Sequence, residues 1–438
     1  MNSTRTRRMG LLCLLFCCVI SVSWGFHIER ASPSGMQDFK GVYSYARCLL
    51  QYRDPYQAGE PLRVYLAEAG SRTEPSDVLR EILSLNMYLP TAFVFTVPFA
   101  MLPWGAAQLL WMIVTAASLI LAAFLMGNLG VDYAPVLSVG LIGFLLANSE
   151  ALFATGNPAG IAVCRCVTAV WCFLKGRFVP AGILCLALSL AIKPHDAGLV
   201  WLYFLLAGGV YRRRALQTLA MTVVLGLPAV LWVTLVSPHW MQELRSNLLT
   251  AAAPGGQLNL GPASAVSGSG PSMRIDLQSA ISLVWSDPSI YLPASYMICA
   301  AFLLVWAFAL SRANSSPAKA WLALAAIVPI AILITYHRPY DAKLLLLTVP
   351  ACAMLWAGGG AIGWIAFLAT AAGIVSTGDV PLVILDILTR NLHLSSTGQC
   401  GQILAALLTR PVPFILLAMG IFYLWAYWRR DATSVQPA

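Results

Sequence analysis

Long apolar blocks separated by shorter polar segments run through the whole chain. Their lengths approach the ~20 residues that an α-helix needs to cross a hydrocarbon core about 30 Å thick. The candidate spans are residues 9–26, 88–103, 105–126, 134–148, 158–174, 178–192, 197–210, 216–236, 291–311, 319–336, 344–359, 360–377 and 411–428. This pattern predicts an all-α polytopic membrane protein, in which residues 1–438 form a single integral membrane domain.

Basic residues at the ends of alternate blocks predict the orientation. Lysine and arginine are enriched in cytoplasmic loops. The basic residues in question are Arg5, Arg7, Arg8, Lys175, Arg177, Arg212, Arg213, Arg214, Arg312, Lys319, Arg429 and Arg430. We therefore expect a plasma-membrane protein whose two termini both lie in the cytoplasm. The two long polar stretches, residues 27–87 and 237–290, are then extracytoplasmic loops, the first of them directly after the first helix.

The number of spans follows from this orientation. Three blocks lie between the outer loop at 27–87 and an outer loop at 149–157, where an even number of crossings is required. One block therefore does not cross, and the candidates are 88–103, which contains two prolines, and the short 134–148. We expect about 12 transmembrane helices, within a range of 11 to 13.

The charge distribution supports the scheme when 88–103 is the block that does not cross. Twelve Lys/Arg and two acidic residues then lie inside, a net charge of +10. Fourteen Lys/Arg and sixteen acidic residues lie outside, a net charge of −2, and Arg165 lies within a span.

The first block, preceded by arginines, also fits a signal peptide. Because Ser23-Trp24-Gly25-Phe26 is not a small-x-small cleavage site, we expect an uncleaved first span.

Composition excludes several other classes of protein. The chain is 59% hydrophobic and only 10% charged, which is too apolar for a soluble domain. Its net charge of +9 does not indicate a nucleic-acid partner, because the basic residues gather at block ends rather than on one face. Most of the eleven cysteines lie in apolar blocks without CxxC or Cys/His spacing. We therefore expect membrane lipids as surroundings, and neither a disulfide framework nor a metal site.

Polar residues that could carry chemistry gather at the predicted outer membrane edge, where ionisable residues indicate function. Asp38 is either a general base or the N-cap of an amphipathic surface helix, and the sequence leaves both open. Asn157-Pro158 is expected to be a loop. Residues 193–196 (Lys-Pro-His-Asp) are a candidate phosphate clamp or a snorkelling lysine followed by a turn. Residues 336–343 contain more charged side chains than a belt of Tyr and Arg at the membrane interface requires.

Together these motifs resemble glycosyltransferase family 87, polytopic enzymes of the GT-C superfamily, over roughly residues 37–345. The family pattern is carried by Asp38-Phe39, Tyr43, Ala46-Arg47, Asp54-Pro55-Tyr56, Tyr88-Leu89-Pro90, Gly156-Asn157, Lys193-Pro194 and His337. Tyr88-Leu89-Pro90 lacks the first proline of the family's Tyr-Pro-Pro, and Gly156-Asn157 lacks its glutamine. These two departures leave open a sugar other than mannose.

The resemblance implies a GT-C type bundle and a membrane hexosyltransferase. The donor would be a polyprenyl-phosphate sugar, typically mannose, and the acceptor a lipid or glycan at the extracytoplasmic face. Asp38 would deprotonate the acceptor hydroxyl, and transfer would invert the anomeric carbon. No cofactor is implied.

The remaining site residues are implied for donor phosphate and substrate binding. They are Lys193, His337, Arg338, Tyr43 and His195. The alternative is a transporter or flippase of lipid-linked sugars, which the absence of visible repeats disfavours. A non-catalytic scaffold protein would not explain why the charged candidate residues all lie on the same side of the membrane.

Overall fold

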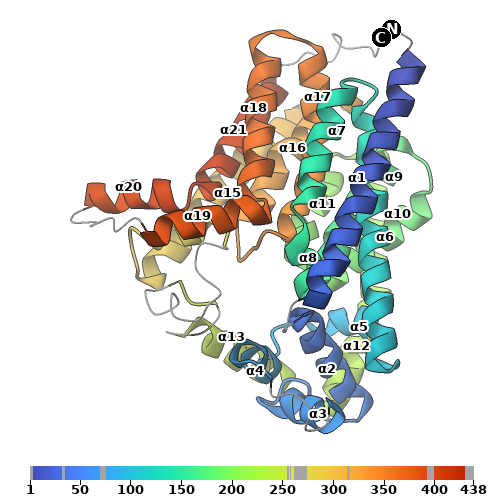
Figure 1. Ribbon diagram of the computed structural model, residues 1–438, viewed down its shortest axis with the longest axis vertical. Coiled ribbons are helices and arrows are strands. Elements are labelled where there is room, and N and C mark those ends of the chain that lie inside the picture. Colours follow the sequence, from blue (N-terminus) through green and yellow to red (C-terminus); the bar gives the residue numbers. More distant parts are fainter. Residues whose placement is uncertain are drawn as a thin grey trace.

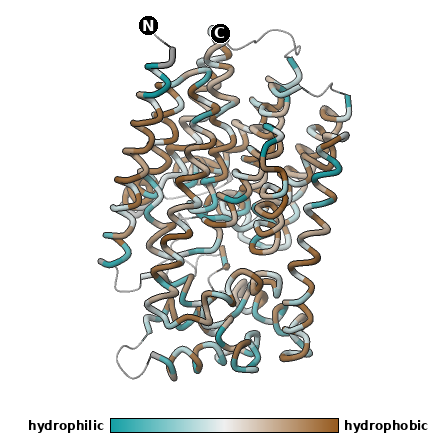
Figure 2. Tube along the Cα trace, turned by 90° about the vertical axis from the view of Figure 1, so that its right-hand side faces the viewer, coloured by the Kyte–Doolittle hydropathy of each residue, from teal (hydrophilic) through white to brown (hydrophobic). Residues whose placement is uncertain are grey.

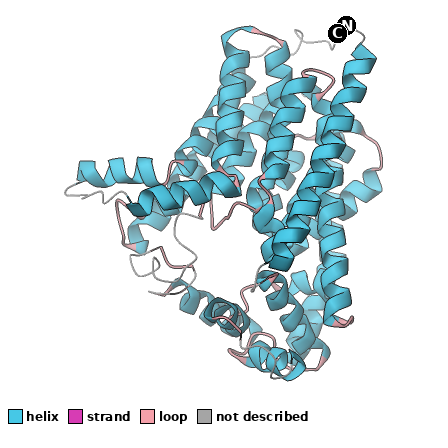
Figure 3. Ribbon diagram, viewed as in Figure 1, coloured by secondary structure: helices cyan, strands magenta, loops and turns pink. Residues whose placement is uncertain are grey.

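The structure is a computed structural model that describes residues 3–31, 35–69, 75–253, 256, 258–260, 274–312, 316–391 and 399–429. Within these ranges the chain forms helices joined by turns and loops, and no strand is found there (Figure 3). A backbone without strands satisfies its hydrogen bonds inside each helix, as a lipid environment demands. The prediction of an all-α protein is therefore confirmed.

Within the described ranges, seven helical segments are long and apolar enough to cross a membrane. They are α1 (Ser3–Ala31), α6 (Trp104–Gly130), α7 (Pro135–Ala147) continued by α8 (Glu150–Thr155), α9 (Pro158–Lys175), α12 (Gly209–Val236), α15 (Pro288–Arg312) and α21 (Val412–Arg429). Apolar residues line most of their lengths (Figure 2). Their outward faces carry large exposed side chains such as Phe16, Val224 and Leu304, which a protein surrounded by water would bury. The chain is therefore a multi-pass membrane protein.

Five further predicted spans form shorter helices. They are α10 (Val179–Ile192), α11 (Pro194–Leu206), α16 (Pro317–Leu333), the 3₁₀ helix η5 (Asp341–Thr348) continued by α17 (Val349–Ala357), and α18 (Gly360–Ser376). At 1.5 Å per residue, the 14 residues of α10 reach only about 21 Å. A count of twelve requires all five to cross together with the seven long segments. The number of spans therefore stays a prediction.

The question of which block fails to cross has a structural answer. Residues 88–103 form the 3₁₀ turn η2 (Pro90–Ala92) and the short helix α5 (Phe93–Ala100). Pro90–Ala100 is eleven residues long, about 16 Å, which is far short of a bilayer core. By contrast Pro135–Thr155 is a 21-residue candidate span. Block 88–103 is thus the one whose length rules out a crossing.

The core lies where four elements meet in the middle of the bundle. The side chains of α9, α16, η5 and α17 are buried along nearly their whole length. α9 packs against α6 and α10, whereas α16 packs against α21, α11 and η5. α1 covers α7 and α8 from outside. Most residues buried at these contacts are small or branched, which allows close packing between helices, although η5 also buries Asp341 and Lys343.

The two polar stretches fold over one end of the bundle. The first forms α2 (Gln37–Leu50), α3 (Glu60–Ala69) and α4 (Asp77–Ser84), and the second forms α13 (Trp240–Ala252) and α14 (Leu277–Ile281). Residues 261–273 of the second stretch lie outside the described residues. Figure 1 shows both ends of the chain at one end of the bundle and α2, α3, α4 and α13 at the other.

Two helices leave the bundle sideways near its middle (Figure 1). They are α19 (Asp379–Asn391) and α20 (Gln399–Thr409). The chain bends by 73° between α18 and α19. Their exposed faces carry apolar residues, including Val383, Ile387, Leu404 and Leu408. The polar stretch near 378–410 is thus largely helical.

Close approach of α1 to α8 depends on Gly25. A Cβ atom at this position would lie 2.4 Å from Cδ2 and 2.6 Å from Cγ of the buried Phe153 ring. We expect Gly25→Val to destabilise the protein by about 1–3 kcal/mol, because a rigid ring cannot yield without shifting the helix. Thermal unfolding of the purified protein in detergent measures the change.

Gly140→Val in α7 is the matched control. Nothing lies within 4 Å of a Cβ atom built at Gly140. This variant should unfold at the wild-type temperature. Equal stability of the two variants would contradict the close contact between α1 and Phe153.

Candidate active site

A cavity of about 320 Å³ lies between the bundle and the helices that cover its end. Its walls come from α2, α4, the junction of α10 and α11, and the segment before η5. The lining residues are Gln37, Asp38, Tyr45, Val78, Glu81, Ile82, Leu85, Met87, Tyr88, Leu89, Asn157, Ile192, Lys193, Pro194, His195, Leu248, Leu258, Thr335, Tyr336, Arg338 and Tyr340. Polar and charged groups occupy the side next to the bundle, and the α4 and α13 side is mainly apolar apart from Glu81.

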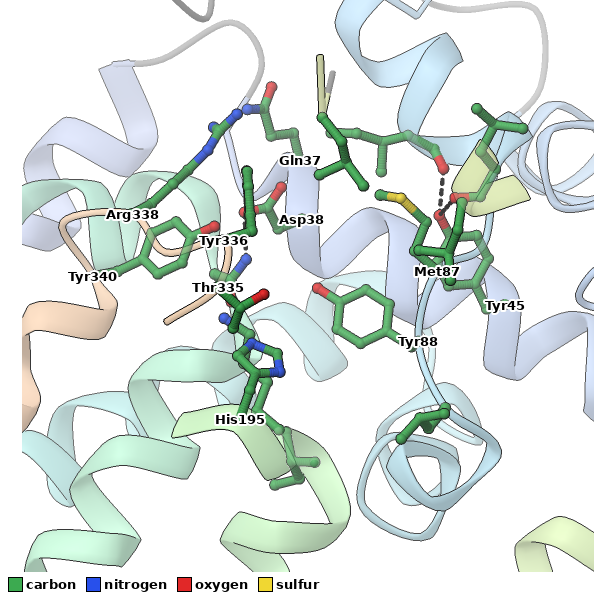
Figure 4. Close-up of a pocket in the computed structure, with 18 of the residues that line it drawn as sticks. Gln37, Asp38, Tyr45, Met87, Tyr88, His195, Thr335, Tyr336, Arg338 and Tyr340 are labelled. Atoms are coloured by element: carbon green, nitrogen blue, oxygen red, sulfur yellow. Dashed lines mark hydrogen bonds between the residues drawn. The ribbon is translucent and has the colours of Figure 1, made fainter. Parts of the chain in front are cut away.

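Asp38 is the second residue of α2 and faces this cavity (Figure 4). The helix begins at Gln37, and its N-cap is Met36, which has a left-handed backbone and no capping side chain. The interpretation of Asp38 as the N-cap is therefore wrong. The Met36 amide instead donates to the carbonyl of Ala154, over 2.6 Å, which ties the start of α2 to the end of α8.

Asn157 holds the Asp38 carboxylate in place. Its Oδ1 accepts from the Ala159 amide at 2.9 Å and so caps α9, which leaves Nδ2 to donate to Asp38 Oδ2 at 2.8 Å. The residue expected to be a simple loop position thus joins two elements 119 residues apart. Burial raises the pKa of Asp38, although the Asn157 hydrogen bond and the charges of Arg338 and Lys193 oppose the shift. A carboxylate with a raised pKa is a stronger base.

Lys193 lies at the junction of α10 and α11, where two short helices meet. Its Nζ donates to Asp341 Oδ1 at 2.8 Å and lies 3.8 Å from Asp196 Oδ2. Asp341 Oδ2 also accepts from the Arg338 amide at 2.8 Å, so this carboxylate shapes the turn before η5. Burial alone would lower the pKa of Lys193, but the two carboxylates outweigh it and the pKa is raised. The ammonium is therefore charged and already paired.

His337 lies beneath the cavity wall and is 1% exposed. Its Nδ1 is 2.8 Å from the Thr335 carbonyl, and its Nε2 is 2.9 Å from Asp196 Oδ1. His195 does line the cavity, and its ring meets that of His337 edge to face at 5.2 Å.

Arg338 presents its guanidinium to the cavity close to Gln37 and Asp38 (Figure 4). It packs 5.6 Å from the centre of the Tyr336 ring, and its Nε has no hydrogen-bond partner among the described residues. It therefore differs from Lys193, whose charge is already matched by carboxylates. An arginine fork with free donors is suited to bind a phosphate.

Tyr43, like His337, is a predicted site residue that does not line the cavity, and it lies farther from the site. Its hydroxyl donates to the Leu102 carbonyl at 2.8 Å. Its ring packs edge to face against Trp104 and Phe39. It thus anchors α2 to the turn between α5 and α6, on another face of the helix from Asp38.

Arg165, whose role the sequence leaves open, also lies away from the cavity lining. Its guanidinium is 5.6 Å from the centre of the Phe95 ring in α5. An arginine inside a long apolar helix is thus covered by an aromatic ring.

Four residues that complete the site lie in the motifs that the sequence singled out, but no role of their own follows from the sequence. Tyr88 and Tyr340 line the cavity beside Asp38 (Figure 4). Asp196 and Asp341 are both 1% exposed and form the network around Lys193. The available signal was a carboxylate three residues after Lys193 and another three after Arg338. Acidic residues close in sequence to a lysine and an arginine suggest ion pairs, but spacing alone does not show which side chains form them.

The fold and the cavity together define a membrane protein with a charged, partly apolar site at one end of a helical bundle. The family model of glycosyltransferase family 87 matches residues 86–335, more than half of the chain. The chain therefore belongs to glycosyltransferase family 87 and is a membrane glycosyltransferase, as its motifs predict. Comparison with curated proteins and with solved structures gives no match.

The matched segment divides the site. It contains Asn157, Lys193, His195 and Asp196, whereas Asp38 precedes it and the segment from Tyr336 onward follows it. Family membership thus rests on the bundle and on one wall of the cavity. The other two walls join it through the contacts described above.

The paired state of Lys193 makes a stability prediction. Lys193→Ala leaves Asp341 and Asp196 buried without their cation, and should cost about 3–5 kcal/mol of stability. The unfolding temperature in detergent should fall clearly. Lys193→Met combined with Asp341→Asn replaces charges by neutral groups of similar size and should recover much of the loss. A single variant as stable as the wild type would show that the pair is not formed.

Proposed function

We propose that this glycosyltransferase moves a hexose, with mannose the first choice, from a polyprenyl-phosphate donor to a lipid or glycan acceptor. The observation that carries the proposal is a carboxylate and a guanidinium in one cavity, where the guanidinium makes no ion pair with a carboxylate among the described residues. Asp38 and Arg338 come from segments 300 residues apart and line the same space. Such a cavity offers a base for a hydroxyl and a cation for a phosphate.

The proposed reaction is a single displacement. The Asp38 carboxylate takes the proton of the acceptor hydroxyl as its oxygen attacks the anomeric carbon of the donor. The bond from this carbon to the phosphate oxygen breaks, and lipid phosphate leaves with the bonding electrons. Attack opposite the leaving group inverts the anomeric configuration. Negative charge gathers on the leaving phosphate, where a preorganised cation stabilises the transition state.

Arg338 is the first candidate for this cation. Its Nε has no partner among the described residues, whereas Lys193 is already paired with Asp341. Lys193 and His337 then act through the turn that carries Arg338, and His195 contributes a wall beside the donor. Tyr43 supports α2 behind Asp38 and is left without a substrate contact.

The shape of the cavity fits a lipid-linked substrate. Val78, Ile82, Leu85, Met87 and Leu248 make its wall opposite the charged residues apolar. An apolar wall favours an isoprenoid or acyl chain over a nucleotide. The sequence offers no glycine-rich phosphate loop for a nucleotide sugar.

The proposed orientation places the cavity outside the cytoplasm of the plasma membrane. The support is the charge count of +10 against −2 and the position of the chain termini, which lie at the end of the bundle away from α2 (Figure 1). We also propose that the five short apolar helices cross with the seven long ones, which gives about 12 spans.

Asp38→Asn tests the assignment of the base. Asparagine can still accept the hydrogen bond from Asn157 but cannot take up a proton. Transfer from a radiolabelled polyprenyl-phosphate mannose should fall by about 10²–10⁴-fold, the usual contribution of general base catalysis. Folding and donor binding should be nearly unchanged.

Asp287→Asn is the matched control for this test. Asp287 Oδ1 accepts from the Ser289 amide at 2.8 Å, a contact that asparagine reproduces, and Asp287 does not line the cavity. Its transfer rate should equal that of the wild type. Normal transfer by Asp38→Asn would contradict the proposed mechanism and favour a transporter.

Arg338→Ala tests the donor contact. Loss of a charge-assisted hydrogen bond of about 1.5–3 kcal/mol should weaken donor binding by roughly 10- to 150-fold. The KM for the polyprenyl-phosphate sugar and direct binding of polyprenyl phosphate both measure it. Arg245→Ala removes an exposed arginine outside the cavity and should leave both values unchanged. Unaltered donor binding by Arg338→Ala would remove this residue from the phosphate site.

A further inference from the structure

Two histidines and a carboxylate converge at the wall of the cavity. Nε2 of His195, Nε2 of His337 and a carboxylate oxygen of Asp196 all lie within 4.8 Å of one another. Asp196 Oδ1 is 2.9 Å from His337 Nε2 and 3.7 Å from His195 Nε2. Two donors each about 2.1 Å from one ion lie roughly 3.0–3.4 Å apart at octahedral or tetrahedral angles. The three atoms therefore nearly enclose a position for an ion.

The hydrogen bond on the far side of His337 fixes its tautomer. The Thr335 carbonyl 2.8 Å from Nδ1 can only accept, so Nδ1 carries a proton. Nε2, which lies 2.9 Å from Asp196 Oδ1, is then the ring nitrogen left to hold either a second proton or a metal ion. A backbone carbonyl behind the distal nitrogen is the usual support of a metal-binding histidine.

Asp196 carries a second sign of a missing partner. The residue is 1% exposed, and its Oδ2 makes no hydrogen bond with any described residue. The nearest cation, Lys193 Nζ, is 3.8 Å away and donates to Asp341 instead. A buried carboxylate oxygen without a donor is costly, so a ligand on this carboxylate would relieve that cost.

The carboxylates around the site point the same way. Asp38, Asp196 and Asp341 outnumber Lys193 and Arg338, and Glu81 also lines the cavity. A bound divalent ion would add positive charge where an anionic phosphate-bearing donor would enter.

We propose that His195, Asp196 and His337 bind one divalent first-row transition-metal ion. Two imidazoles and one carboxylate are the donor set that such ions prefer over magnesium or calcium. His195 lines the cavity, so the free coordination positions of the ion face the proposed substrate. That the ion would meet a donor phosphate rests on the proposed function, whereas binding of the ion does not.

Spacing in the sequence does not predict this cluster, because His337 lies 141 residues from Asp196 and no cysteine takes part. It differs from the expectation of a site without metal, which was based on cysteine and histidine spacing. His195 and Asp196 are brought to His337 only by the packing of α11 against α16, since His337 follows the end of α16.

Metal binding by the full-length protein in detergent tests the proposal without donor or acceptor. The protein is stripped with a chelator and titrated with Zn²⁺, followed by calorimetry and elemental analysis after desalting. A Co²⁺ titration adds the visible absorption of a nitrogen- and oxygen-bound ion. We expect one ion per chain, and at least a 10-fold loss of affinity in His195→Ala and in Asp196→Asn.

His239→Ala is the matched control, because His239 is exposed and distant in sequence from the cluster. It should bind Zn²⁺ as the wild type does. His195 has a side chain that is 37% exposed, so its replacement keeps the test valid if Asp196→Asn fails to fold. Zn²⁺ should raise the unfolding temperature of the wild type but not of His195→Ala.

Either of two results would overturn the proposal. One is a wild-type protein without saturable Zn²⁺ binding, and the other is undiminished binding by His195→Ala. Failure of the glycosyl-transfer proposal is a separate result, because it would leave the stoichiometry and the Co²⁺ spectrum unchanged.

Discussion

The ion pair between Lys193 and Asp341 is the interaction on which the site depends. It lies in an apolar bundle, where a single unpaired charge is far more costly than at a surface. The pair fixes the junction of α10 and α11 against the turn before η5, because Asp341 also accepts the Arg338 amide. The ends of α10 and α11 and the turn before η5 are thereby held together as one wall of the cavity. The orientation of the Arg338 guanidinium towards the cavity follows from this turn.

The second wall is attached by a different kind of contact. α2 belongs to the segments that cover the end of the bundle, and it meets the bundle at the end of α8. A backbone hydrogen bond from Met36 to Ala154 and the Asn157–Asp38 hydrogen bond form this attachment. Asn157 links the capping of α9 to the orientation of Asp38. The carboxylate proposed as the base is held by a helix-capping residue and is therefore positioned as precisely as the helix itself, as preorganised chemistry requires.

Electrostatics sets a constraint that geometry alone does not satisfy. A cavity proposed to take an anionic donor is lined and backed by more carboxylates than cations. Asp38 is needed as a base, and Asp341 is needed for the turn. Asp196 is then the carboxylate without such a role, and it already lies next to two histidines. This imbalance connects the proposed transfer reaction to the proposed metal site, although each can be tested without the other.

The sequence by itself determined the class of protein, the helical character and most candidate residues. Hydrophobic block length follows from bilayer thickness, so apolar patterning was enough to place the seven long segments. Asp38, Lys193, His195 and Arg338 were found because charge at a membrane edge is costly and is retained for function. Tertiary structure alone decided which of these charges are paired and which are free. It also showed that Tyr43 faces another helix surface and that 88–103 is too short to cross. The ion pairs, the tautomer of His337 and the burial of these side chains depend on contacts between residues more than a hundred positions apart, such as His337 and Asp196. No local sequence pattern predicts such contacts.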